Sequence, residues 1–314
     1  MAKEIRTVYG EALVKYGKEN KNIVVLDADV CGSTKTCLFR DAFPERFFNV
    51  GIAEANMTAI AAGLATVGKI PFVNTFAAFL TTLGLLPSRA YGSYDKLPIK
   101  LMGAYGGMSD AFDGPTHHSL EDIAIMRSLP NFKVYVAGDA TSTDWLVKHA
   151  LEDPSPMYIR LSRNAFVDLY DAQTVFEDGK GNVVKDGSDA TVVACGYMVG
   201  NSLEAAKLLK DEGISVRVVD MFSIKPIDSE LLLSSARETG AIITAEEHSI
   251  IGGLGAAVAE VLSEANAKVP LGRVGTLDRH AETGPYPKLI EKYGLSPKAI
   301  AAKVLETIKK KSQA

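Results

Sequence analysis

Short apolar runs rich in β-branched residues alternate with longer helical segments, and this alternation constrains the fold more than any other feature. In the first half of the chain the apolar runs predict strands at residues 22–26, 47–50, 70–74, 99–102, 132–136 and 157–161. Helical patterns lie between them, at 3–19, 51–65, 77–93, 119–128 and 141–151. Strands that are apolar throughout and separated by helices indicate a parallel sheet covered on both faces.

A second unit of the same kind follows a stretch in which the pattern lapses. Turn sequences at 178–182 and 185–187 predict a linker with a hairpin. Beyond it, strands are expected at 190–195, 215–221, 240–245 and 272–276, and helices near 199–212, 228–238, 253–265 and 296–311. A chain of 314 residues is too long for one ordinary core. We therefore expect an α/β fold of two doubly wound, mostly parallel-sheet domains, at 1–166 and 188–314, joined by a linker at 167–187.

Composition and charge exclude several classes of function. A net charge of -4 and a pI of about 5.8 argue against a nucleic-acid-binding protein. No charge-free apolar run reaches the ~18 residues of a membrane span, and the N-terminus lacks the apolar core of a signal peptide. Cys31, Cys37 and Cys195 have no metal-type spacing and fit a reducing cytoplasm. The sequence predicts a cytoplasmic protein with no metal ligands of its own.

Glu54 is an acid within a run of small and apolar residues at 51–65. On a helical wheel it lies on the side of Met57 and Ala61. A buried carboxyl without a partner usually takes up a proton and can then donate a hydrogen bond. The alternative is a helix-start acid that interacts with the N-terminal dipole while its head stays in water. The helix alone leaves both interpretations open.

Residues of several chemical types follow the predicted strands. Ligands of open α/β sheets bind at the carboxyl ends of the strands, so different side chains at one rim indicate a site. The candidates at this rim are Asp29, Ser33, Glu54, Phe76, Phe79, Tyr105, Asp113, His117 and Arg163.

The loop at 110–118 displays two of these candidates. Gly114-Pro115 fixes a turn and Thr116 can cap the following helix, which leaves Asp113 and His117 displayed rather than packed. His117 is the candidate for catalysis or substrate contact, whereas a structural role is expected for His118.

Other candidates also have ordinary structural explanations. Phe76 and Phe79 are three residues apart, a spacing more typical of a core. Arg163 can bind phosphate or equally pair with Asp144 or Asp168. A solvated charge is the default interpretation for Arg6, in the first helix.

Four ordered motifs carry a family resemblance. They are Phe48-Asn49-Val50-Gly51-Ile52-Ala53-Glu54, Thr75-Phe76-Ala77-Ala78-Phe79, Asp113-Gly114-Pro115-Thr116-His117 and Met126-Arg127-Ser128-Leu129-Pro130-Asn131. Their order and spacing resemble the pyrimidine-binding domain of transketolases. The unit that begins with Val192-Val193-Ala194-Cys195-Gly196 resembles the transketolase C-terminal domain, so the resemblance covers nearly the whole chain.

The resemblance implies a thiamine diphosphate site. The cofactor's own aminopyrimidine acts as the base that generates its carbanion. Glu54 matches the acid that bonds to N1′ of this ring and promotes the required tautomer. Phe76 and Phe79 match aromatic residues that stack on the pyrimidine, and Asp29 matches an acidic residue near the cofactor.

The resemblance also implies a substrate site for a sugar phosphate. His117 matches a histidine at the reacting end of the substrate, for proton transfer or hydrogen bonding. Asp113 matches a residue that reads a sugar hydroxyl. Arg6, Ser33 and Arg163 match the pocket for the terminal phosphate.

Two positions depart from the family pattern. Tyr105 stands where a histidine near the phosphate is common, which weakens the inference of the usual phosphorylated sugars. Thr82 stands where a third aromatic residue often lies beside the pyrimidine, so stacking is expected from two rings only.

A missing motif is the largest departure. Residues 1–314 contain no GDG sequence with an Asn on the order of 30 residues downstream, the family's way of holding magnesium. The chain therefore resembles the C-terminal half of a split transketolase, whose N-terminal partner subunit supplies the magnesium and diphosphate site. Self-association is also expected, and a heterotetramer of two chains of each kind fits a cofactor bound between subunits.

Three alternatives remain open at this point. The beta subunit of a 2-oxo acid dehydrogenase resembles this chain in its two domains, its length and its separate partner. A fragment of a deoxyxylulose-phosphate synthase shares similar motifs. A non-catalytic assembly subunit could also keep the fold.

Overall fold

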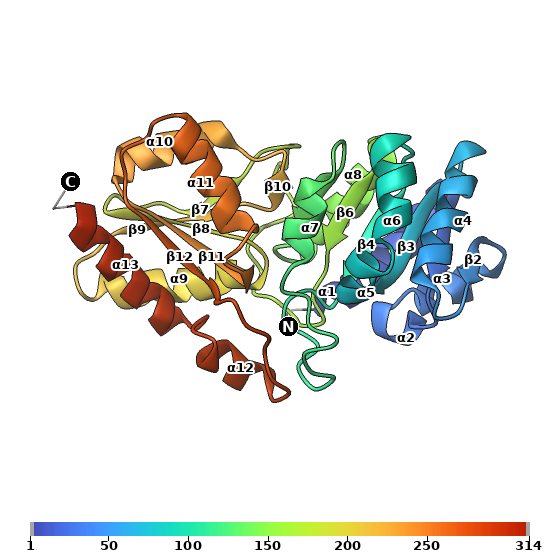
Figure 1. The fold of residues 1–314 in the computed structure, drawn as a ribbon, viewed down its shortest axis with the longest axis horizontal. Helices are drawn as coiled ribbons and strands as arrows, with labels where there is room; N and C mark the ends of the chain where they lie inside the picture. Colours follow the sequence, from blue (N-terminus) through green and yellow to red (C-terminus); the bar gives the residue numbers. More distant parts are fainter. Residues whose placement is uncertain (1–2, 312–314) are drawn as a thin grey trace.

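The computed structural model describes residues 3–311 and contains two α/β units side by side along its long axis (Figure 1). The first sheet has the strand order β10-β5-β6-β4-β3-β1-β2, and the second has the order β12-β11-β8-β9-β7. All pairs within these sheets are parallel except β10 with β5 and β7 with β9. The predicted fold class, two mostly parallel-sheet α/β units, is confirmed.

The first sheet consists of strands that are short and largely buried. Its members are β1 (Ile23–Asp27), β2 (Phe47–Asn49), β3 (Ile70–Phe76), β4 (Lys100–Ala104), β5 (Lys133–Val136), β6 (Met157–Arg160) and β10 (Ser223–Lys225). Every residue of β1 and of β4 is buried, as expected for strands covered on both faces.

Helices of the first unit cover both faces of this sheet. They are α1 (Ile5–Glu19), α2 (Cys31–Thr34), α3 (Cys37–Ala42), η1 (Pro44–Arg46), α4 (Glu54–Thr66), α5 (Ala77–Thr82), α6 (Leu85–Pro87), η2 (Ser88–Tyr94), α7 (Asp122–Ser128) and α8 (Ala140–Glu152). The expected continuous helix at 77–93 is wrong, because it is broken into α5, α6 and a π-helical turn, η2. Gly84 separates α5 from α6, and a Cβ there would lie 2.5 Å from the Leu80 carbonyl oxygen. Pro87 then removes a backbone donor.

The second unit repeats the architecture on a smaller scale. Its strands are β7 (Asn182–Lys185), β8 (Ala190–Ala194), β9 (Val216–Asp220), β11 (Ile242–Ser249) and β12 (Leu271–Thr276). Its helices are α9 (Tyr197–Lys210), α10 (Ser229–Thr239), α11 (Leu254–Glu264), α12 (Tyr286–Lys292) and α13 (Pro297–Lys311). The hairpin predicted in the linker is wrong. The strand between the two turn sequences, β7, pairs with β9 instead. Among residues 3–311, no helix is both long and apolar enough to cross a membrane.

The outer edge of the first sheet is completed by a strand from far downstream. Strand β10 pairs antiparallel with β5, and Ser223 lies opposite Tyr135. The backbone N–H of Val136 also donates to the carbonyl of Phe222 at 2.9 Å. The domain boundaries at 1–166 and 188–314 stay a prediction, and β10 crosses that division.

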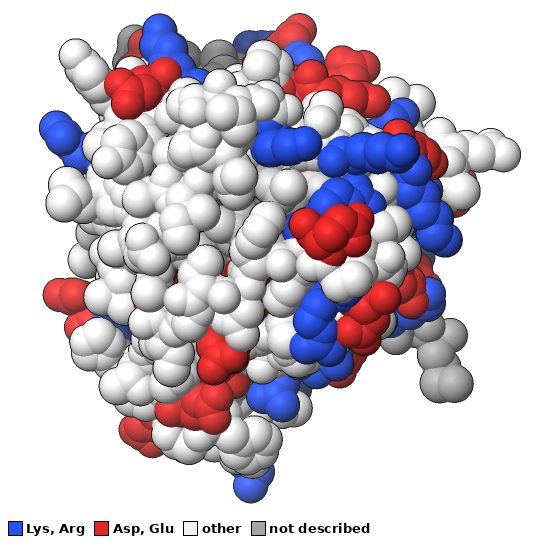
Figure 2. Space-filling model, turned by 90° about the vertical axis from the view of Figure 1, so that its right-hand side faces the viewer, with Lys and Arg blue, Asp and Glu red and all other residues white. Residues whose placement is uncertain are grey.

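A broad face at one end of the molecule carries few charges (Figure 2). That end is formed by the region of α4 and α6, and α4 packs against α6 and η2. The exposed apolar side chains of these elements and of the turns next to α4 and α5 include Ile52, Val67, Leu83, Leu86 and Tyr94. We call this set the apolar face. Large exposed apolar patches often mark interaction sites.

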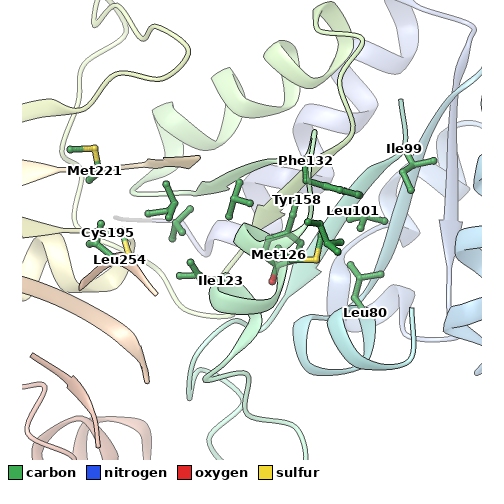
Figure 3. Packing of buried hydrophobic residues seen from close by; sticks show 14 of the residues in the cluster. Leu80, Ile99, Leu101, Ile123, Met126, Phe132, Tyr158, Cys195, Met221 and Leu254 are labelled. Carbon is green, nitrogen blue, oxygen red and sulfur yellow. The ribbon is translucent and has the colours of Figure 1, made fainter. Parts of the chain in front are cut away.

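One apolar cluster joins the two units through α7 (Figure 3). Ile123 and Met126 of α7 belong to the same cluster as Leu101 of the first sheet and Cys195 and Met221 of the second unit. All five side chains are at most 2% exposed. The packing between the units is therefore continuous core, which fixes the position of the loops between them.

Candidate active site

The candidate residues meet at the carboxyl edge of the first sheet. Phe76 ends β3, Tyr105 follows β4, and Arg163 lies shortly after β6. Because these strands are parallel, their carboxyl ends meet at one rim. Glu54 reaches the same rim as the first residue of α4.

The carboxyl group of Glu54 is buried. Glu54 is 4% exposed, and its neighbours Met57 and Ala61 are fully buried. Thr75 Oγ1 donates to Glu54 Oε1 at 3.4 Å, which is long for a hydrogen bond between oxygens. Although Glu54 begins α4, its head does not lie in water, so the solvated helix-start alternative is wrong. The weakly bonded carboxyl has capacity for a further partner.

Phe76, Phe79, Tyr105 and His117 form a group of four rings at the same rim as Glu54. Phe76 stacks on Tyr105 with centroids 4.7 Å apart and planes at 15°. His117 contacts Phe79 edge-on at 5.0 Å and Phe76 at 5.8 Å. Thr82 takes no part in this group; it is exposed and donates to the carbonyl of Ala78 at 2.6 Å. The aromatic surface is therefore built without a third phenyl ring from α5.

The loop after β4 leaves Asp113 exposed but packs His117 against Phe76 and Phe79, and it lacks the expected cap. Thr116 Oγ1 lies 3.0 Å from His117 Nδ1 and caps no helix, because α7 begins only at Asp122. An antiparallel bridge between Gly107 and Ser119 holds the chain extended before that helix. His117 is half-buried and Asp113 is exposed.

His118 differs from its neighbour in the same loop. Its side chain is buried, and burial lowers the pKa of His118, so the ring is neutral near pH 7. This environment agrees with the structural role expected for His118.

Tyr105 lies close to two guanidinium groups. Arg6 Nη1 donates to the Tyr105 hydroxyl at 2.5 Å. The guanidinium carbons of Arg6 and Arg163 each lie 5.5 Å from the centroid of the Tyr105 ring. Arg6 also donates to the backbone carbonyl of Ser33 at 3.3 Å. The side chains of Arg6, Tyr105 and Arg163 and the backbone carbonyl of Ser33 therefore form one cluster with two positive side chains, which we call the anion pocket.

Arg163 pairs with a residue that the sequence did not single out. Arg163 Nη1 lies 3.3 Å from Asp110 Oδ1, so its predicted surface pairing with Asp144 or Asp168 is wrong. Asp144 instead pairs with Lys15 at 2.8 Å. Asp110 is fully buried although it belongs to the loop. Only the folded loop brings these two side chains together, and no sequence pattern indicates it.

Asp29 lies at the rim in a strained conformation. It is exposed and has φ of 66°, and its Oδ1 accepts from Asn49 Nδ2 at 2.8 Å. Asn49 Oδ1 in turn accepts the backbone N–H of Gly51 at 3.0 Å, so Asp29 is connected to the turn before α4. Asp27 is buried and accepts from Thr34 and Thr36, which is a structural role.

The second unit holds the site loop by several polar contacts. Glu247 of β11 accepts the backbone N–H of Met108 at 2.7 Å and the hydroxyl of Tyr286 at 3.0 Å. The N–H of Gly284 donates to the carbonyl of Ala111 at 3.1 Å. The hydrogen bonds to Met108 and Ala111 fix the loop that carries Asp113 and His117, and the sequence predicted neither of them.

Two family models cover most of the sequence. The transketolase pyrimidine-binding domain matches residues 2–167, and the transketolase C-terminal domain matches residues 179–300.

The chain belongs to the transketolase family.

Split members of this family are similar to the chain over nearly their whole length. A protein of Methanocaldococcus jannaschii, described provisionally as a transketolase C-terminal section, is 41% identical over 310 residues, which cover 98% of this chain and 97% of that protein. A 6-deoxy-6-sulfo-D-fructose transketolase subunit of a Clostridium species is 39% identical over 308 residues, covering 98% and 95%. The inactive β4 tetramer of a split-gene transketolase superimposes with a TM-score of 0.89 and 49% identity, covering 98% of this chain and 99% of that one.

Proposed function

We propose that this chain is one subunit of a thiamine-diphosphate-dependent transketolase that moves a two-carbon ketol unit from a ketose phosphate to an aldose. The buried, weakly bonded carboxyl of Glu54, at the same rim as a cluster of rings, carries this proposal. An acid in this setting can bind a ring nitrogen by a hydrogen bond, and the neighbouring phenyl rings can stack on a planar heterocycle. The cofactor supplies the carbanion chemistry when it is bound.

The chain's own residues divide the remaining work between the cofactor and the sugar. Glu54 holds a proton toward N1′ of the pyrimidine, while Phe76 and Phe79 contact its faces and exclude water. Asp29 lies at the same rim and bonds Asn49. His117 orients or protonates oxygen atoms at the reacting end of the sugar, and Asp113 bonds a hydroxyl group further along it.

The anion pocket supports a sugar with a charged terminus. Arg6 and Arg163 both lie beside Tyr105, and two guanidinium groups near one another bind phosphate or sulfonate oxygens well. This arrangement favours a ketose phosphate donor over a 2-oxo acid, which presents only its carboxylate.

A partner subunit is needed to complete the site. Residues 1–314 lack the GDG motif, so the magnesium ligands and the diphosphate site are proposed to come from a separate N-terminal subunit. The apolar face adjoins the start of α4, where Glu54 lies, and it is the surface we assign to assembly. Without its partner, the chain is proposed to associate with further copies of itself. The active form is proposed to be a heterotetramer.

Mixing experiments test the function directly. The purified chain should show no ketol transfer with thiamine diphosphate and magnesium, and activity should appear when the N-terminal subunit is added. Transfer to an aldose phosphate is measured beside decarboxylation of a 2-oxo acid. Full transfer by this chain alone contradicts the split site, and decarboxylation without transfer favours the 2-oxo acid dehydrogenase class.

A further inference from the structure

Each guanidinium group of the anion pocket is already paired with a carboxylate in this structure. Arg6 Nε lies 3.0 Å from Glu4 Oε2, and Arg163 Nη1 lies 3.3 Å from Asp110 Oδ1. The two pairs differ in burial, because the Glu4 side chain is 45% exposed whereas that of Asp110 is 0% exposed. Glu4 can therefore release Arg6 and be solvated by water, but Asp110 cannot.

The surroundings of Asp110 offer little compensation for a negative charge. Its Oδ2 atom is buried and has no hydrogen-bond partner among residues 3–311. Asp113 faces it from the same loop, Arg163 from the segment after β6, and Arg6 from α1, while His118 interacts with its backbone. Burial, followed by the neighbouring Asp113 carboxyl, raises the pKa of Asp110 to about 7, against the opposing effect of Arg163 and Arg6.

We propose that Asp110 competes with the anionic end of the sugar for Arg163, and that it takes up one proton from solvent when the anion binds. This inference rests on the proposed function, because it concerns the same substrate pocket. The incoming oxygen anion accepts the Arg163 N–H groups and displaces Asp110 Oδ1. Asp110 then lies buried beside Asp113, and Arg163 no longer fully compensates its negative charge because the guanidinium group binds the anion. The protonated, neutral form of Asp110 is therefore favoured. The O–H bond that forms on Asp110 is balanced by the O–H bond that breaks in the solvent or buffer acid, and the proton offsets the charge of the incoming anion.

Asp110 is thus a positioning residue that makes anion affinity depend on pH. Below its pKa, Asp110 is already neutral and Arg163 is free to bind the anion. Above its pKa, each bound anion requires one proton, so the affinity falls about tenfold for each pH unit. A sugar with an uncharged terminus does not need Arg163, so its affinity should not follow this dependence.

Sulfate is a suitable probe because its charge does not change in this range. A phosphate ester loses its second proton near pH ~6, which would obscure the titration of Asp110. The assembled two-subunit complex is titrated calorimetrically with sodium sulfate at about pH 6 and about pH 8.5, in buffers of different ionisation enthalpy. Proton uptake should rise from near zero to about one per sulfate, and the affinity should fall at least tenfold.

Two variants and a matched control distinguish this effect from a structural one. Asp110→Asn keeps the side-chain shape, and it should abolish proton uptake and bind sulfate at least ~10-fold more tightly than the wild type at the higher pH. Arg163→Gln should bind sulfate poorly at both pH values. Asp186→Asn removes an exposed carboxylate that pairs with Arg217 at 2.8 Å, and it should behave as wild type.

Several outcomes would overturn the inference. Proton uptake that persists in Asp110→Asn, sulfate affinity that is independent of Arg163, or the absence of sulfate binding by the wild type at the lower pH each contradicts it. These binding readouts do not depend on turnover. A complex that binds sulfate as described but transfers no ketol group would contradict the proposed function alone.

Discussion

Glu247 accepts the backbone N–H of Met108 at 2.7 Å although the two residues are 139 positions apart in sequence. The second carboxylate oxygen accepts the hydroxyl of Tyr286 at 3.0 Å. One buried acid of the second unit therefore holds the beginning of the loop that carries Asp113 and His117. The second unit acts on the site by fixing that loop, without contributing a side chain to the group of rings.

Replacing Glu247 by Ala should loosen the site loop. Met108 would lose the acceptor for its buried N–H group, which costs about 1–3 kcal/mol in local stability. We expect faster hydrogen exchange at residues 106–119 and a kcat at least ~10-fold lower in the assembled complex, since misplaced catalytic groups lose rate steeply. Glu282→Ala is the control, because Glu282 is exposed and pairs with Lys292 at 2.6 Å, away from Met108. Unchanged exchange in the loop would refute the anchoring role.

Replacing Glu54 by Gln should remove the acid while keeping its shape. An amide cannot pass a proton to the pyrimidine ring, so we expect ketol transfer by the complex to fall by about 100-fold or more. Thermal unfolding should change little, because the carboxyl makes only one long hydrogen bond among the described residues. Glu45→Gln, at an exposed site in the same unit, should be fully active. An active Glu54→Gln complex would support the non-catalytic assembly subunit instead.

A charge on the apolar face should weaken assembly. Leu86 is 73% exposed, so Leu86→Asp should leave the fold intact. Placed in a desolvated interface, the new carboxylate should raise the dissociation constant for the partner subunit at least ~10-fold, as measured by sedimentation. Val175→Asp introduces the same change at a position that is 74% exposed in the linker, and it should assemble normally. Equal dissociation constants for the two variants would show that the face is not the interface.

Asp220 should make stability depend on pH. It is fully buried, it accepts the Tyr170 hydroxyl at 2.7 Å, and burial raises its pKa to about 7. The unfolded chain releases this proton near pH ~4, so between these values the native state holds it more tightly. Stability from this group is therefore greatest at low pH and is lost as the pH rises to about 7.

The Asp220→Asn variant isolates this contribution. Between about pH 5 and about pH 8, urea unfolding of the wild type should lose roughly 1–3 kcal/mol relative to Asp220→Asn, whose side chain does not titrate. If the free energy of unfolding changes with pH equally in the two proteins, the pKa of Asp220 is not raised in the folded state.

Local pattern was sufficient to predict most strands of the two sheets, but it left the burial of Glu54 open, and the structure decided that point. Strand β1 could be predicted because it is a continuous run of apolar residues. Helix α4 could be predicted because its small and apolar residues recur at helical spacing. The pairing of Arg163 with Asp110 was not predictable, because it depends on the path of a loop and on two segments distant in sequence. Glu247 was missed for the same reason. The break at Gly84 was missed because helical periodicity continues across it.

Strand β10 has a consequence for how the protein is made. During synthesis the strands of the first sheet up to β6 leave the ribosome before Ser223 is added, so β5 is then an open edge. Exposed edges pair readily with other chains, and N-terminal domains generally fold first. The nascent first sheet therefore stays exposed to mispairing until the second unit has begun to emerge, and a ribosome that stalls before that point would release a chain prone to aggregation.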